Sequence, residues 1–154
     1  MPADSERGTP ALPHTWRPLG PRLAGIIFGT ALFVVCAFAW YGWDEETRAR
    51  FTFLQRATLV FFGLLVFACM YALIRSRVVA ESDRLVVVNG YRRHEYEWAE
   101  IIAVHLPPGA PWATLDLADG TTAAVMGIQG SDGNRAQRAV RELRRLVAEA
   151  SASQ

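Results

Sequence analysis

The sequence predicts a membrane hairpin of two transmembrane α-helices followed by a small α+β domain. Two apolar runs, residues 23–43 and 57–74, contain no Asp, Glu, Lys, Arg or His. As a helix rising about 1.5 Å per residue, each run is about as long as the hydrocarbon core of a bilayer is thick. Later in the chain the pattern changes to short strands bounded by tight turns, and then to an amphipathic helix.

Aromatic side chains at the ends of the runs support two membrane spans. Trp40, Tyr41 and Trp43 close the first run and Tyr71 lies near the end of the second, where such rings favour the headgroup level. One alternative is a helical hairpin buried in a soluble core, but the rest of this chain is too small to cover it. Another is a cleaved signal peptide ending near residues 37–39, although the apolar run is longer than such peptides usually have.

The arginine distribution predicts that both termini are cytoplasmic. A two-span protein has both ends on one side, and arginines near the membrane are enriched on the cytoplasmic side. Six lie outside the hairpin near its ends, against three in the loop: Arg7, Arg17, Arg22, Arg75, Arg77 and Arg84 against Arg48, Arg50 and Arg56. The expected location is therefore the cell membrane, with a multi-pass topology.

Three segments follow from this pattern. Residues 1–20 carry four of the eight prolines and are predicted to be a disordered tail. Residues 21–76 form the membrane hairpin, and residues 77–150 form a folded domain that should be stable without the spans. Within the hairpin, Gly25 and Gly29 make a G-x-x-x-G pair. It serves a dimer face, or packing of the two spans on each other, or it has no role.

The third segment has the pattern of an antiparallel sheet. Strands are expected at residues 84–89, 91–98, 101–106, 112–118 and 121–126, with a sixth at 78–80. Asn89-Gly90 predicts a type I′ hairpin turn, and Asp119-Gly120 a second tight turn.

A C-terminal helix is expected to cover this sheet. Ser131 or Asp132 is predicted to cap it, and its apolar positions follow the i, i+3, i+4 spacing. They are Ala136, Ala139, Val140, Leu143, Leu146, Val147 and Ala150. A strongly bent sheet with this helix over its open end would bury every apolar face.

The order of these features resembles a known family. Two spans are followed by the hairpin at Asn89-Gly90, by Trp98-Ala99-Glu100-Ile101, and by Pro111-Trp112 leading to residues 125–129 and a helix. This order is similar to that of bacterial membrane-anchored PH-like domain proteins, and more narrowly of the low-molecular-weight protein antigen 6 PH domain family. The resemblance implies a PH-like fold and no enzymatic activity. It transfers no binding residue.

The loop at residues 80–83 departs from PH domains that bind phosphoinositides. Those domains place basic residues after their first strand, whereas this loop contains Glu81 and Asp83. Acidic side chains repel phosphate, which argues against that ligand here.

No catalytic, metal or cofactor site is predicted. His94 and His105 lack a nucleophile at a recognisable spacing and are interpreted as surface histidines. Cys36 and Cys69 lie one in each span, without further ligands for a metal, and are interpreted as packing residues. Nucleic-acid binding is not expected, because basic and aromatic residues do not alternate on the strands.

The exposed side of the C-terminal helix is the candidate site. Arg138, Arg141 and Arg145 are the predicted contacts to anionic lipid headgroups or to a protein partner. The alternative is a solvated face, in which Glu142 and Glu149 partly neutralise the arginines.

The sequence thus favours an integral membrane protein whose cytoplasmic PH-like domain is a non-catalytic interaction or assembly module. The lipid bilayer and a protein in the membrane are the expected partners. One alternative is an accessory or regulatory subunit of a larger membrane complex. A second is a membrane-bound enzyme completed by a partner chain.

Overall fold

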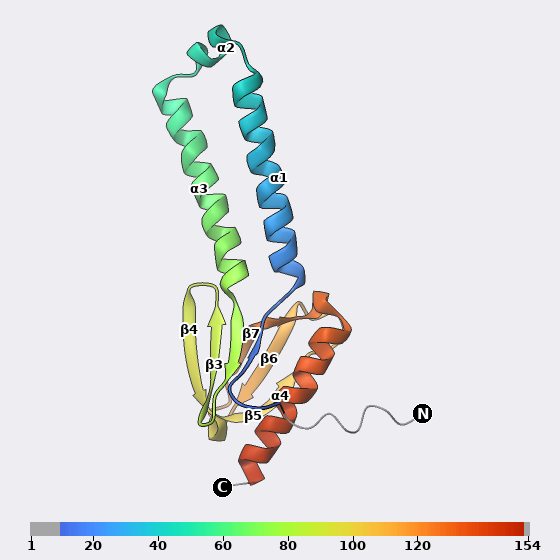
Figure 1. Cartoon of the computed structure of the whole chain (residues 1–154). Coiled ribbons are helices and arrows are strands. Elements are labelled where there is room, and N and C mark those ends of the chain that lie inside the picture. Colours follow the sequence, from blue (N-terminus) through green and yellow to red (C-terminus); the bar gives the residue numbers. More distant parts are fainter. Residues whose placement is uncertain (1–9, 153–154) are drawn as a thin grey trace, which may run out of the picture. The chain divides into compact units, whose positions relative to one another are not determined.

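A computed structural model of the chain describes residues 10–152. These residues form two compact units (Figure 1). One is the helical hairpin, residues 20–74. The other combines residues 75–152 with the segment 10–19 that precedes the hairpin. We refer to this second unit as the sheet domain and describe each unit separately.

The hairpin consists of two long helices joined through a short one. Helix α1 spans Gly20–Gly42, α2 spans Glu45–Arg50 and α3 spans Phe53–Arg75. Asp44 caps α2, its carboxylate accepting the backbone N–H of Thr47 at 2.6 Å. The connecting segment between the predicted spans therefore contains an ordered turn of helix.

Both long helices have the length and composition needed to cross a membrane. Gly25 is the buried residue of α1, and α3 has none. Large apolar side chains are exposed along both, including Phe38 at 81% and Phe53 at 87%. A helix from the core of a soluble protein would be mostly buried, so this exposure disfavours the soluble-core alternative.

The two glycines of the G-x-x-x-G pair have different surroundings. A Cβ atom added at Gly25 would lie 3.4 Å from Cδ1 of Ile74 and 3.6 Å from Sδ of Met70, both on α3. A Cβ atom at Gly29 would have no neighbour within 4 Å. Gly25 thus contributes to packing of α1 against α3, which agrees with the predicted packing of the two spans on each other.

The sheet domain contains two antiparallel sheets. The first has the order β1-β2-β3-β4 and the second the order β5-β6-β7 (Figure 1). The strands are β1 His14–Trp16, β2 Arg77–Ala80, β3 Arg84–Asn89, β4 Arg92–Glu97, β5 Ile101–His105, β6 Trp112–Leu117 and β7 Thr122–Gln129. All six strands predicted after residue 77 are confirmed, and β7 ends three residues later than expected.

Strand β1 corrects the prediction of a disordered tail over residues 1–20. His14, Thr15 and Trp16 pair with β2, and Trp16 is buried in the core of the sheet domain. Its indole N–H donates to Oε2 of Glu142 at 3.0 Å. The proline-rich composition of this segment does not predict a strand, because β1 is stabilised by these long-range contacts. Residues 1–9 lie outside the described part of the chain.

The β3–β4 hairpin forms as predicted but with a different turn. Asn89 pairs with Arg92, so Gly90 and Tyr91 form the two-residue loop. Gly90 has φ of +60°, and no non-glycine residue among those described has positive φ. A type I′ turn needs two such residues, whereas a glycine followed by a residue with negative φ fits type II′.

Asn89 instead connects the two sheets. Its side-chain amide donates to the carbonyl of Ala124 at 2.6 Å, and its carbonyl oxygen accepts the N–H of Met126 at 2.9 Å. Nearby, Gly127 of β7 passes so close to β2 that an added Cβ would lie 2.6 Å from the carbonyl carbon of Arg77. Only glycine permits this approach.

Helix α4, Asn134–Ala152, covers the sheets with the predicted apolar stripe. Six of the seven predicted positions are buried: Ala136, Ala139, Val140, Leu143, Leu146 and Val147; Ala150 is partly buried. The helix begins later than the predicted caps imply, because Ser131 and Asp132 form a separate 3₁₀ turn, η2 Gly130–Asp132. The backbone N–H of Gln137 donates to the carbonyl of Gly133 at 3.1 Å.

Replacing Leu143 by Ala should test this packing. Leu143 has 0% exposure at the centre of the stripe. The variant removes buried methyl groups and leaves a cavity, so we expect the free energy of unfolding to fall by about 2–4 kcal/mol. Denaturant unfolding of the full chain in detergent measures the loss, with the exposed Ala148→Gly as a helix-propensity control. Equal losses in both variants would contradict burial of Leu143.

Candidate functional site

A groove between β1 and α4 gathers basic side chains. It has a volume of about 340 Å³, and Arg17, Arg135 and Arg138 line it together with His14. Arg135 and Arg138 are three residues apart on α4, so both project from the same side of that helix. Arg17 comes from the other wall, just after β1. We call this the basic groove.

The two carboxylates that line the basic groove are hydrogen-bonded to its wall. Glu142 accepts the Trp16 indole N–H, and Oδ2 of Asp132 accepts the backbone N–H of Leu19 at 2.8 Å. Both bonds fasten the segment around β1 to α4 and η2. The groove lining therefore contains three arginines against these two carboxylates.

The structure brings one of the three predicted arginines into this groove. Arg138 lines it, whereas Arg141 and Arg145 lie outside its lining. All three are exposed. Sequence reasoning missed Arg135, which the helical spacing would have found, and Arg17, which lay in the presumed tail.

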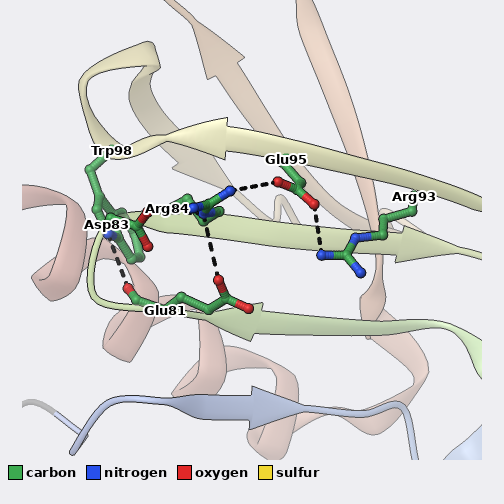
Figure 2. A network of polar contacts seen from close by, with 6 residues as sticks. All are labelled: Glu81, Asp83, Arg84, Arg93, Glu95 and Trp98. Atoms are coloured by element: carbon green, nitrogen blue, oxygen red, sulfur yellow. Dashed lines mark hydrogen bonds and ion pairs between the residues drawn. The ribbon is translucent and has the colours of Figure 1, made fainter.

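A second polar cluster lies on the first sheet, on the face opposite the core residues Leu85 and Val87. The guanidinium of Arg84 contacts Asp83 at 2.7 Å, Glu95 at 2.9 Å and Glu81 at 3.6 Å. Glu95 also contacts Arg93 at 2.7 Å. Figure 2 shows the links from Glu81 through Arg84 on β3 to Glu95 and Arg93, which both lie on β4. We call this the Arg84 network.

The Arg84 network has a structural role. Val86 and Val88 share its face of the sheet, because Arg84 lies two residues before Val86 and Glu95 pairs with Val86. Both valines are almost fully buried, at 3% and 4% exposure. The aliphatic stems of the charged side chains therefore help to cover apolar surface, while the charged ends reach water.

Electrostatics argue against a catalytic role for these carboxylates. Hydrogen bonding to Arg84 holds the pKa of Asp83 and of Glu95 below their ordinary values. A general base for neutral pH needs a pKa raised toward 7 instead. Carboxylates with a lowered pKa add stability above their unfolded pKa and lose it as pH falls through the folded pKa.

Replacing Arg84 by Gln should raise both carboxylate pKa values toward their ordinary range. The reason is that the variant removes the charge and the guanidinium hydrogen bonds that stabilise the ionised forms. Carbon-13 NMR titration of the side-chain carboxyls measures this directly. Arg92→Gln, at the opposite end of β4, is the matched control and should leave the pKa of Asp83 unchanged. An Arg84→Gln variant with unchanged titration midpoints would contradict the network.

The two predicted surface histidines are confirmed at the surface. His105 Nε2 lies 2.7 Å from Oδ2 of Asp116, and its side chain is half exposed. The His94 ring stacks with Tyr96 on β4, with 6.2 Å between ring centroids. Among residues 10–152, no group of three or more His, Cys, Asp or Glu side chains is placed to hold a metal ion.

Comparison with known proteins finds similarity over the second half of the chain. Uncharacterized proteins of Mycobacterium tuberculosis and Mycobacterium bovis are 36% identical to the chain over 86 residues. The alignment covers 56% of this chain and 56% of each relative, so the chain spans about half the length of these curated relatives. No solved structure matches significantly. The family described as "Bacterial PH domain" matches residues 75–146, which confirms the PH-like prediction. Over residues 75–146 this chain is therefore similar to the bacterial PH domains.

Proposed function

We propose that this chain is an integral protein of the cell membrane whose two long helices anchor the PH domain at the membrane surface. There the domain acts as a non-catalytic interaction or assembly module. The family match supports the PH-like domain, and the two candidate spans support the membrane anchor.

The pairing of β1 with β2 carries the proposal. Strand β1 precedes α1 and β2 follows α3, yet Trp16 pairs with Val78 in one sheet. Residues on both sides of the hairpin must therefore be in the same compartment. Two crossings meet this requirement, whereas a single crossing would separate the two strands.

The same pairing argues against a cleaved signal peptide. Cleavage near residues 37–39 would remove β1 together with α1. The sheet domain would then lose the buried indole of Trp16 and expose the edge of β2. A fold that incorporates the segment before the first apolar helix favours a mature protein that retains that helix.

The arginines of the basic groove and of the exposed face of α4 are the proposed contact to headgroups or to a protein partner. Arg17 lies three residues before Gly20, where α1 begins. Three residues span at most about 11 Å, which is comparable to the thickness of one headgroup layer. If α1 crosses the bilayer from Gly20, Arg17 lies near the anionic lipid phosphates. Arg138 shares its groove, and we assign Arg141 and Arg145 to the same contact.

Site-specific photocrosslinking in native membranes tests the function. Benzoylphenylalanine would replace Tyr91, Ile102 or Arg141 in the PH domain, and Phe38 or Phe53 in the hairpin. Arg141 is exposed, and the four apolar positions are strongly exposed, with 59% and 65% for Tyr91 and Ile102. An interaction module should give a discrete protein adduct from at least one domain position.

The pattern of adducts separates the proposal from its main alternative. An accessory subunit that pairs only through its spans should give adducts from Phe38 or Phe53 and none from the domain. That pattern would overturn the interaction-module function. The native chain, irradiated without benzoylphenylalanine, is the negative control for nonspecific capture.

A further inference from the structure

A second groove lies at the end of the sheet domain where β2 runs into β3. Its volume is about 350 Å³. Its apolar lining comes from three parts of the chain: the segment before β1, the 3₁₀ turn η1 Trp98–Glu100, and the last turns of α4. These lining residues are Leu12, Trp98, Ala99, Leu146 and Ala150. Leu12 is 41% exposed, so apolar surface remains open to solvent there.

Acidic side chains surround this apolar floor. Asp83, Glu97 and Glu149 line the groove directly. A neighbouring hollow shares Asp83 and Glu97 and adds Glu95 and Glu100. We call the two together the acidic groove. Arg84 is the cation in its lining, and its guanidinium contacts Asp83 and Glu95.

Two observations indicate a negative potential at this end of the domain. Burial raises the pKa of Tyr96, and the charges of Glu100 and Asp119 raise it further. Helix α4 also ends here, and the C-terminal end of a helix carries partial negative charge. The basic groove lies near the other end of α4, so positive and negative surfaces occupy opposite ends of one helix.

We propose that the acidic groove docks a cationic peptide segment that places an apolar side chain on Trp98 and Leu146 and basic side chains against Asp83, Glu97 and Glu149. Charge complementarity selects a Lys- or Arg-containing partner. The apolar floor selects a peptide over a free cation, because burial of a side chain supplies affinity that a solvated ion lacks. An anionic lipid headgroup would be repelled. This inference rests on the proposed interaction function and names the partner chemistry.

Fluorescence anisotropy with a defined peptide tests the proposal. The full chain would be placed in phosphatidylcholine nanodiscs, with empty nanodiscs as the baseline. The probe is the labelled hexapeptide Arg-Gly-Arg-Leu-Gly-Arg. We expect saturable binding that weakens as salt rises, because exposed charges are screened within about 10 Å at 0.1 M. Replacing the three arginines of the probe by glutamate should abolish binding.

Matched variants locate the site. Asp83→Asn, Glu97→Gln and Glu149→Gln together should weaken binding at least tenfold. Leu12→Ala should weaken it several-fold without loss of fold, since Leu12 is partly exposed. Asp116→Asn removes one acidic charge outside the groove and should leave affinity unchanged. Hydrogen exchange of β2 and β3 checks that each variant is folded.

Three results would overturn the inference: no saturable binding by the native chain, equal binding of the glutamate probe, or unchanged affinity in the triple variant. None of these results would contradict the interaction-module function, which the crosslinking experiment tests separately. A protein adduct from Ile102 or Arg141 combined with failed peptide binding would show that the domain recruits its partner through another surface.

Discussion

Replacing Trp16 by Ala is expected to destabilise the sheet domain by about 3–5 kcal/mol, although this residue precedes the membrane hairpin in sequence. Trp16 is 8% exposed within the domain core, and its indole N–H bonds to Glu142. The variant leaves a cavity and an unpaired carboxylate. Native-state hydrogen exchange of the full chain in nanodiscs should show β2 and β3 amides exchanging roughly 100-fold faster or more.

Thr15 provides the matched control on the same strand. Its side chain is exposed, so Thr15→Ala should change exchange rates little. A third variant, Glu142→Gln, keeps an acceptor for the indole and should lie between the two. If the β2 and β3 amides of Trp16→Ala exchange as slowly as those of the native chain, β1 is not part of the domain. The pairing of β1 with β2 would then no longer support two membrane crossings.

The role of Trp16 also changes the expectation for an isolated fragment. Residues 77–150 contain the predicted sheet and helix, but they lack β1. Without it, the edge of β2 is unpaired and the surface under the indole is open to water. The prediction that this fragment is stable by itself therefore needs residues 10–19 to be supplied as well, since they belong to the same compact unit.

Local patterns predicted most of the fold. Alternating and Val-rich segments located β2 to β7, because strand periodicity depends on which residues face the core. The apolar stripe of α4 was equally clear, and its six central positions are buried. These features are encoded by residues close together in the sequence.

Long-range contacts accounted for what local patterns missed. Strand β1 has three residues in a proline-rich segment, and it forms because β2 offers an edge and α4 offers Glu142. The side chain of Asn89 bonds across to β7 rather than occupying the centre of the turn. Sequence spacing around either residue contains no signal for its distant partner.

The candidate sites show the same division. Arg138 was predicted from the helix face alone. The basic groove also contains Arg17, which precedes the hairpin in the sequence. The acidic groove combines Leu12, Trp98 and Leu146 from three separate segments. Surfaces assembled from distant segments become visible only once the fold brings those segments together.

Cysteine labelling should give an all-or-none result for the orientation of the hairpin. In a Cys36→Ala, Cys69→Ala background, we expect Thr47→Cys to react with a membrane-impermeant thiol reagent in intact cells. Ser5→Cys and Ser153→Cys should react only after permeabilisation. The reason is the excess of arginine at the ends of the hairpin over its loop, six against three.

Ser5 and Ser153 together test whether the two ends of the chain lie in the same compartment. Pairing of β1 with β2 requires the segments before and after the hairpin to share one compartment. Ser5 and Ser153 must therefore agree, whichever side they occupy. If both react in intact cells and Thr47 does not, the arginine count has given the wrong orientation, but the two-span hairpin remains. If Ser5 and Ser153 disagree, the chain crosses the membrane an odd number of times, and a sheet containing both β1 and β2 cannot form.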